Sequence, residues 1–171
     1  MKNIALNTLK YTGIVTLSQY VGSKKVKVAR HHNTGGTSLF NFLADCLIGD
    51  FAMAKATRPF KIMLVKRTKE ESGGITTYSY EQKSGFITLL TTPEKVQSNT
   101  QCRVRYSFII PKDQIESIND FEDFGIGLYA NKVEEPENFA AFCELDLSKN
   151  SLISASLVVD WELIVSNNVA N

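Results

Sequence analysis

The feature that most constrains this sequence is a strict two-residue alternation of apolar and polar side chains. Its clearest example ends at Pro111, where apolar side chains fill every second position, as Cys102, Val104, Tyr106, Phe108 and Ile110. The last such run, residues 156–165, puts Trp161 on an apolar face and Asp160 and Glu162 on the opposite face. Successive side chains of a β-strand point to opposite faces of the sheet, so this period predicts strands that are buried on one side.

Runs of β-branched and aromatic residues extend the same pattern over most of the chain. The expected strands are residues 11–20, 25–30, 60–66, 75–81, 86–90, 102–110, 124–130, 139–147 and 156–165. Turn residues predict one hairpin between the first two strands, ended by residues 33–36, and another between 75–81 and 86–90. The polar stretches 67–74 and 91–100 are expected to be exposed loops.

One segment has the period of a helix instead. Within residues 38–48 the apolar positions recur three and four apart, with Thr37 or Ser38 as N-cap and Gly49 as the C-terminal stop. We expect a short α-helix here whose stripe, which includes Leu39, Leu43 and Leu47, packs on the sheets.

The length of 171 residues favours a single domain, residues 1–171. Many short antiparallel strands predict a mainly β fold, an antiparallel β-sandwich of the jelly-roll kind with about eight or nine strands and the inserted helix. No apolar run approaches the roughly 20 residues that span a bilayer, and residues 1–8 are too polar for a signal-peptide core. We therefore expect no membrane association.

The residues that usually carry chemistry are sparse. Cys46, Cys102 and Cys143 are far apart among apolar neighbours and are expected to be buried thiols, while His31 and His32 are adjacent and would point to opposite faces of a strand. Neither set has the spacing of a zinc site or a nucleophile beside its base. We expect no metal, no cofactor, no catalytic residue and no enzymatic activity.

Three further groups each have an ordinary structural explanation. The run of glycines and hydroxyls at 35–38 resembles a phosphate-binding turn but matches neither Gly-x-x-x-x-Gly-Lys-Ser/Thr nor Gly-x-Gly-x-x-Gly. The carboxylates at 120–123 lack the calcium-loop spacing. Four aromatic side chains suit a sugar-stacking platform, but their alternation already places them in the core or on a sheet face: Tyr78, Tyr80, Tyr106 and Trp161.

Charge is unevenly distributed along the chain although the net charge is only +1. Residues 1–85 contain 13 basic and 5 acidic residues, and residues 86–171 contain 6 basic and 13 acidic ones. The low net charge argues against sequence-specific nucleic-acid binding. Two interpretations stay open: interleaved solvated loops, or complementary surfaces between copies. On the second interpretation the expected subunit interface is Lys24, Lys25 and Lys27 against Glu134, Glu135 and Glu137.

Several packing and turn motifs resemble those of small virion proteins of tailed bacteriophages, particularly short-tailed crAss-like phages. They are His32-Asn33-Thr34-Gly35, Leu39-Phe40-Asn41-Phe42-Leu43, Leu47-Ile48-Gly49-Asp50, Arg58-Pro59-Phe60-Lys61-Ile62-Met63-Leu64 and the final strand Leu157-Val158-Val159-Asp160-Trp161-Glu162-Leu163. The resemblance covers roughly the first 65 residues and the last stretch of the chain. It implies a virion protein assembled in the host cytoplasm, present in many copies in the neck, tail or capsid surface.

The expected function is thus a non-enzymatic structural subunit of a phage virion. It would form a symmetric homo-oligomer, as a head-to-tail connector or tail ring, and contact other virion proteins through sheet edges, loops and complementary charge. The alternatives are a capsid decoration or head-fibre protein, a carbohydrate-binding β-sandwich module, and a small hydrolase whose site the sequence does not reveal. An exposed pair of clustered aromatics would favour the carbohydrate module.

Overall fold

A computed structural model of the chain describes residues 8–21, 23–35, 39, 41–42, 44, 46, 49–50, 52–53, 58–98, 101–118, 123–130, 133–145 and 156–168. The described part contains ten strands and the short helix α3 (Lys112–Glu116). The strands are β1 (Thr8–Val21), β2 (Lys24–Gly35), β3 (Pro59–Ser72), β4 (Ile75–Gln82), β5 (Ile87–Thr88), β6 (Glu94–Gln97), β7 (Gln101–Ile110), β8 (Phe124–Ala130), β9 (Ala141–Glu144) and β10 (Leu157–Asn168).

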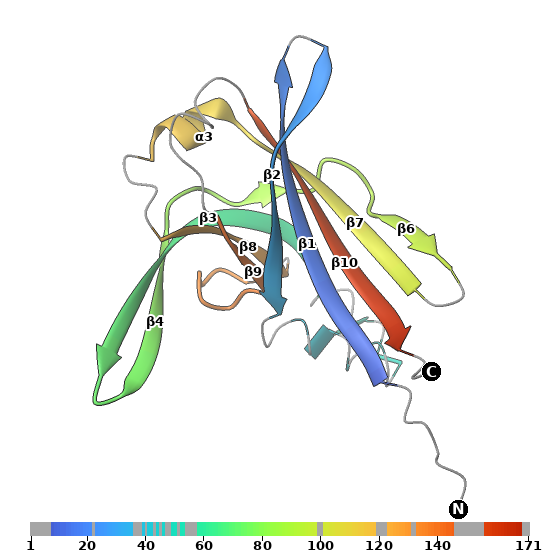
Figure 1. Ribbon diagram of the computed structural model, residues 1–171, viewed down its shortest axis with the longest axis horizontal. Coiled ribbons are helices and arrows are strands. Elements are labelled where there is room, and N and C mark those ends of the chain that lie inside the picture. Colours follow the sequence, from blue (N-terminus) through green and yellow to red (C-terminus); the bar gives the residue numbers. More distant parts are fainter. Residues whose placement is uncertain are drawn as a thin grey trace, which may run out of the picture.

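The strands form two antiparallel sheets that share β2 (Figure 1). The first sheet has the order β2-β1-β10-β7-β6, and the second has the order β4-β3-β8-β9 and then the end of β2. β2 pairs with β1 up to Asn33 and with β9 at Thr34 and Gly35. The expectation of a mainly β, two-sheet fold is confirmed, with ten strands instead of eight or nine.

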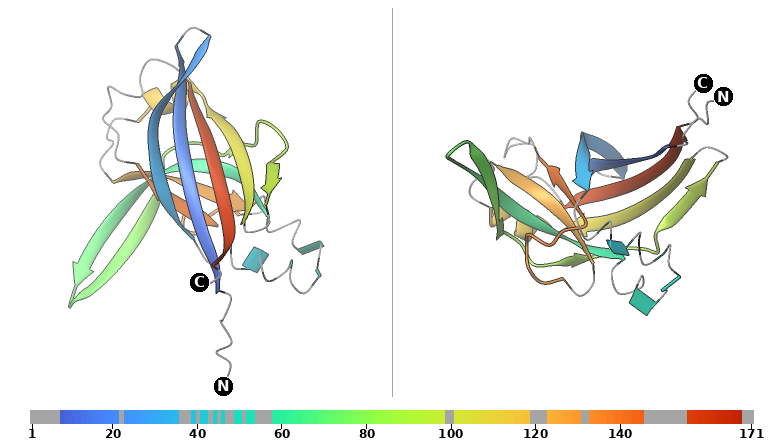
Figure 2. Two further views of the ribbon diagram at one scale, coloured as in Figure 1. Left: turned by 45° about the vertical axis from the view of Figure 1, so that its right-hand side comes forward. Right: turned by 90° about the horizontal axis from the view of Figure 1, so that it is seen from below.

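The segment after β4 joins the two sheets on their other side. Its strand β5 pairs with β3, and the Leu89 amide donates to the Phe60 carbonyl at 3.3 Å. The next amide, that of Leu90, donates to the Ser107 carbonyl of β7 at 2.9 Å. Main-chain hydrogen bonds therefore connect the sheets at both sides of the core, and the two layers enclose it (Figure 2).

The main core lies between the sheets and follows the predicted alternation. Its largest side chains, Trp161 and Phe108, are fully buried. Leu17 of the same sheet, and Ile62 and Leu128 of the facing sheet, belong to this core. Asp160 and Glu162 lie on the outer face of the same strand as Trp161. Burial of these apolar side chains is the main stabilising contribution to the fold.

A second apolar cluster covers the outer face of the β3-β8-β9 sheet. Met63, Val65, Tyr129 and Phe142 are buried there, under the loop that connects β8 to β9. The Tyr129 hydroxyl donates to the Pro136 carbonyl at 2.8 Å, and burial raises the pKa of this phenol. On β8, Gly125 and Gly127 alternate with the inward-facing apolar residues. Because they have no side chain, they leave room for the Phe142 and Tyr129 rings of this cluster.

We expect Gly125→Ala to destabilise the protein by about 1–3 kcal/mol, because an added Cβ overpacks this cluster. The Cβ would lie 2.3 Å from the Phe142 ring and 2.7 Å from the Cys143 carbonyl oxygen, a backbone atom that cannot move freely. The matched control is Gly85→Ala, whose Cβ would have its nearest atom at 3.9 Å. Urea unfolding checks both variants, and an equal effect at the two sites would contradict this packing.

The predicted helix over 38–48 is supported at each of its described residues. Leu39, Asn41, Phe42, Ala44 and Cys46 are helical. Leu39 is 2% exposed and belongs to the main core, whereas Leu43 and Leu47 lie outside the described residues. Gly49 has a φ of +77°, the left-handed conformation expected of a C-terminal stop. In the described part of the chain, no helix is both long and apolar enough to cross a membrane.

Several strand boundaries and one pairing differ from the sequence-based expectation. β2 continues through residues 33–35 because Thr34 and Gly35 gain a new partner, β9. The polar stretch 67–72 extends β3, since β4 pairs along it, and residues 94–97 form β6. The expected hairpin between 75–81 and 86–90 is wrong, because both segments pair with β3. The helix α3 was not predicted.

Candidate assembly surface

The three lysines of the predicted interface lie at the tip of the β1–β2 hairpin. This tip extends past β10, whose first residue, Leu157, pairs with Gln19, and Figure 1 shows it projecting from the first sheet. Lys24, Lys25 and Lys27 are all exposed. Only Lys25 has an ion pair within the described residues, with its Nζ 2.7 Å from the Asp160 carboxylate. The tip is therefore an exposed cationic projection.

The three glutamates of the predicted interface lie in the loop that covers the outer face of the second sheet. Glu134, Glu135 and Glu137 are exposed. The Asn138 amide donates to the Glu135 carboxylate at 3.3 Å, and hydrogen bonds from the loop backbone and from this amide lower the pKa of Glu135. Burial lowers the pKa of the Lys61 amine, and the negative charge of Glu134 opposes this shift. In the described part of the chain, no ion pair joins this acidic loop to the lysine tip.

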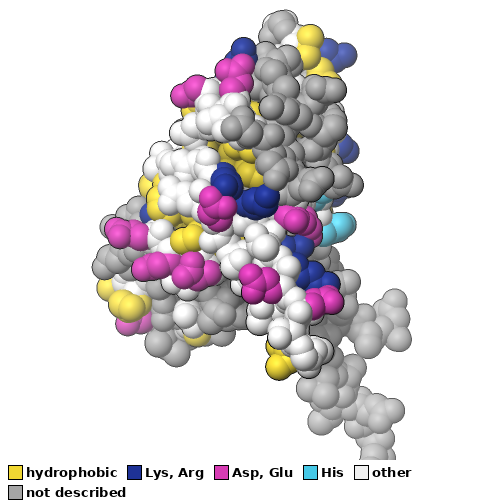
Figure 3. Space-filling view, turned by 90° about the vertical axis from the view of Figure 1, so that its left-hand side faces the viewer, with side chains coloured by type: hydrophobic (Ala, Val, Ile, Leu, Met, Phe, Trp, Pro, Cys, Tyr) yellow, Lys and Arg dark blue, Asp and Glu magenta, His cyan; other side chains and the backbone are white. Residues whose placement is uncertain are grey.

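The fold mixes the basic and acidic halves of the sequence. β10, from the acidic half, pairs with β1, and β8, also from the acidic half, pairs with β3. Ion pairs also join residues of the two halves, for example Arg67 and Glu144 at 2.6 Å. Figure 3 shows acidic and basic side chains interspersed over one side of the molecule. The sequence asymmetry therefore becomes local charged groups instead of two oppositely charged halves.

The outer face of the first sheet has its own ion-pair network. Glu162 lies between Arg103 and Arg105, with carboxylate-to-guanidinium distances of 3.6 and 2.7 Å. The hydrogen bond from Arg105 to Glu162 raises the pKa of the guanidinium, and Ser107 donates to Asp160 at 2.7 Å. These side chains form ion pairs and hydrogen bonds with one another across β7 and β10, so they help to hold the two strands together.

The aromatic residues considered for sugar stacking separate into two pairs. Tyr106 and Trp161 are in the main core. Tyr78 and Tyr80 lie on the outer face of β4, where the Tyr80 ring packs edge-on to Phe142 with centroids 5.4 Å apart. Tyr78 is 48% exposed, and the Arg67 guanidinium lies 4.8 Å from its ring centroid. One exposed ring is available here, whereas a stacking platform needs neighbouring exposed rings.

The other residues considered for chemistry are kept apart by the fold. His31 faces inward and pairs with Val15, whereas the exposed His32 faces outward beside Ile14, as predicted for adjacent residues of a strand. Within the described residues, no group of three or more His, Cys, Asp or Glu side chains is arranged to hold a metal ion. Residues 36–38 and 120–122 of the glycine-hydroxyl and carboxylate runs lie outside the described part.

The three cysteines differ in burial, so the expectation that all are buried is wrong. Cys143 is buried, Cys102 is half-buried and Cys46 is exposed. The burial of Cys46 is expected from its apolar sequence neighbours, but at this position of the helix the residue is exposed to solvent. Burial raises the pKa of the Cys143 thiol to about 12.

We expect iodoacetamide at pH 8 to alkylate Cys46 at least about 100-fold faster than Cys143. The thiolate is the reactive form, and a raised pKa and burial both suppress it at Cys143. Peptide mass spectrometry over time measures the two rates, and alkylation in urea is the control that should make them similar. Equal rates in the native protein would show that the Cys143 side chain of β9 is not buried in the core between the sheets.

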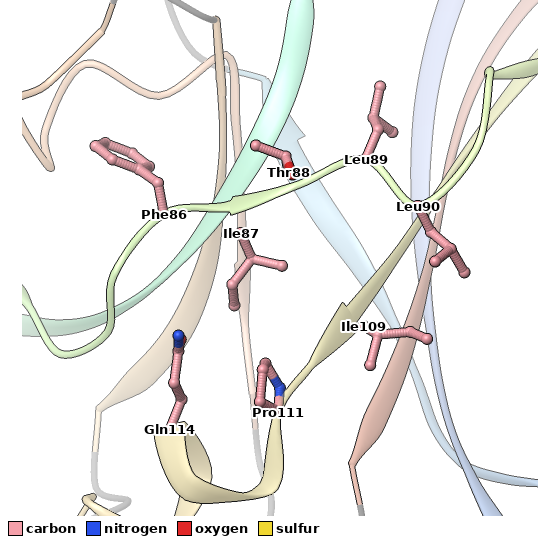
Figure 4. Close-up of a pocket in the computed structure, with 8 residues that line it drawn as sticks. All are labelled: Phe86, Ile87, Thr88, Leu89, Leu90, Ile109, Pro111 and Gln114. Carbon is pink, nitrogen blue, oxygen red and sulfur yellow. The ribbon is translucent and has the colours of Figure 1, made fainter.

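A groove of about 370 Å³ lies where the segment joining the sheets meets α3. Figure 4 shows the Gln114 side chain extending from α3 toward the segment that carries Phe86 and Ile87, with Leu90 beside Ile109. Thr88 and Gln114 are the polar residues of its lining, and the rest are apolar. The groove therefore offers apolar contact and a few hydrogen-bonding groups.

Comparison of the chain with protein-family models, with curated proteins and with solved structures finds no match in any of the three.

Proposed function

We propose that this chain is a non-enzymatic structural subunit that assembles with copies of itself in a bacteriophage virion, as part of a connector or tail ring. The virion setting follows from the resemblance of its packing and turn motifs. The observation that supports self-assembly best is that an exposed lysine tip and an exposed acidic loop lie on different elements and make no ion pair with each other among the described residues. Each group is thus available to the opposite group of a neighbouring copy.

Such a contact joins two different surfaces, so it is head-to-tail. Repetition of a head-to-tail contact gives a closed ring when the rotation between copies closes, and an open filament when it does not. Exposed charge pairs mainly give orientation and speed of association and are screened by salt over about 8 Å at physiological ionic strength. The proposal therefore requires an assembly that weakens as salt rises.

The test reverses the two lysines that have no internal ion pair among the described residues. We expect Lys24→Glu with Lys27→Glu to lower the association constant at low salt by at least tenfold, as measured by sedimentation velocity. Lys25 stays unchanged because it holds Asp160 within the chain. Adding Glu134→Lys and Glu137→Lys to the same chain should restore association at least in part, since both surfaces then have swapped signs.

The matched control is Lys112→Glu, which reverses an exposed lysine on α3 that pairs locally with Glu116. It should leave association unchanged. Salt-sensitive assembly that the control weakens as much as the double reversal would refute the role of the lysine tip. Binding only to purified capsids, with no self-association, would instead favour the decoration-protein alternative.

A further inference from the structure

The two edge strands, β6 and β4, differ greatly in how well they are protected against pairing with another strand. At one end, β6 has four residues, follows Pro93 and carries Glu94 and Lys95. These are features that discourage pairing with another strand. At the other end, β4 has eight residues, ITTYSYEQ, with one charged side chain and no proline or lysine. β4 pairs with β3 without a register shift, and its other edge has no strand partner in the described sheets.

Most of β4 also lies beyond the body of the second sheet, where β3 is its one described strand neighbour. β8 pairs with β3 only as far as Lys66, so residues 68–79 form a two-stranded arm, which Figure 1 shows projecting from the body. The arm turns at Gly73 and Gly74, whose φ angles of 59° and 79° fit a tight two-residue turn. Seven of the eight β4 residues are exposed. A two-stranded ribbon is marginally stable on its own in water, so a further strand on its free edge would stabilise the arm.

We propose that the free edge of β4 pairs antiparallel with β4 of a second copy about a two-fold axis at Ser79. This contact deepens the proposed function, on which its biological role rests, by adding a second interface between copies. A two-fold axis through an edge strand makes the new pair antiparallel, the more favourable arrangement. The second sheets of the two copies become one continuous sheet through the dimer.

The side chains of β4 fit this register. Tyr78 and Tyr80 share the outer face, so pairing about Ser79 places Tyr78 of each copy opposite Tyr80 of the other. Aromatic cross-strand pairs are favourable, and Tyr80 already packs against Phe139 and Phe142. On the other face Glu81 meets Thr77, so no like charges oppose each other. The partly exposed Tyr78 ring gains an aromatic neighbour from the second copy.

Cysteine cross-linking tests the register directly. With Cys46→Ser and Cys102→Ser as background, we expect Ser79→Cys to give a disulfide-linked dimer under mild oxidation. The two Ser79 Cα atoms at the axis would lie about 4.5–5.5 Å apart, within the range a disulfide bridges. The matched control, Thr76→Cys, is exposed on the same strand but lies six residues from its own copy across the axis, roughly 20 Å away. It should give at most a tenth of the cross-linked product.

A second variant tests the contact without a covalent bond. Ser79→Lys places two ammonium groups opposite each other at the axis. In the chain that also carries Lys24→Glu and Lys27→Glu, we expect it to weaken dimerisation at low salt at least tenfold, whereas Thr76→Lys should not. Equal cross-linking by both cysteine variants would overturn the proposal, because it indicates random collision. So would cross-linking of Ser79→Cys only to a Gln97→Cys partner, which would show that β4 pairs with β6.

Cross-linking through Ser79→Cys can be tested independently of the proposed charge contact. Adding Lys24→Glu and Lys27→Glu to the Ser79→Cys chain keeps the β4 edge intact, so this chain should cross-link as efficiently as the unreversed one. Cross-linking of Ser79→Cys without salt-sensitive assembly would support the β4 dimer and refute the charge contact. Salt-sensitive assembly without cross-linking of Ser79→Cys would do the reverse.

Discussion

Trp161→Ala should lower the free energy of unfolding by about 3–5 kcal/mol, the range found when a large buried aromatic is truncated. Trp161 is 0% exposed at the centre of β10, where it pairs with Val15 of β1 on one side and Tyr106 of β7 on the other. Its side chain therefore reaches the core from the middle of the first sheet. Removing it leaves a cavity between the sheets that the surrounding strands cannot fill.

Guanidinium unfolding followed by circular dichroism measures this loss, since the variant lacks the single tryptophan of the chain. The control is Val96→Ala on β6, where the side chain is 62% exposed and the change should stay within about 0.5 kcal/mol. A loss for Trp161→Ala no larger than that of the control would mean that β10 does not line the core.

Leu39→Ala should lower the free energy of unfolding by about 2–5 kcal/mol, because it removes a side chain of the helix over 38–48 that is buried in the main core. A helix this short is not stable alone in water, so it depends on its packing against the sheets. The matched control, Asn41→Ala, changes an exposed position of the same helix and should have little effect. A loss below about 0.5 kcal/mol for Leu39→Ala would place this helix outside the core.

Alternation predicted strands well where one face is buried and the other is polar. β7 agrees with the expected residues to within one position, and Trp161 faces the core as its apolar neighbours predicted. β8 also has the expected bounds, although it is buried on both faces. The fold class follows from this pattern because burial on one face is a local property of a strand. The helix over 38–48 followed equally from local spacing and its final glycine.

Pairing and strand length could not be read in the same way, because they depend on partners distant in sequence. Residues 67–72 are polar, yet they continue β3 because β4 pairs along them. Residues 33–35 carry turn-forming side chains, yet β9 extends β2 through them. The expected hairpin before residue 90 failed for the same reason, since β3 is the common partner of β4 and β5.

The predicted interface shows the same difference between properties that follow from local sequence and properties that depend on distant strands. The exposure of the lysine tip and of the acidic loop follows from local polarity, and both groups are exposed. The ion pair of Lys25 with Asp160 depends on strand order, which local sequence does not encode. The unprotected edge of β4 was also missed, although its only signal, a long uncharged stretch of Thr, Tyr and Ser, is visible in the sequence.

The most direct test of the proposed role is the mass of the unmodified protein in solution, measured by size-exclusion chromatography with light scattering at low and at high salt. Copies joined by both contacts should give a mass above twice the 19.1 kDa of the chain at low salt. Raising the salt should screen the charge contact and leave the dimer joined through β4. A mass of 19.1 kDa at both salt concentrations, across the accessible protein concentrations, would contradict self-assembly altogether.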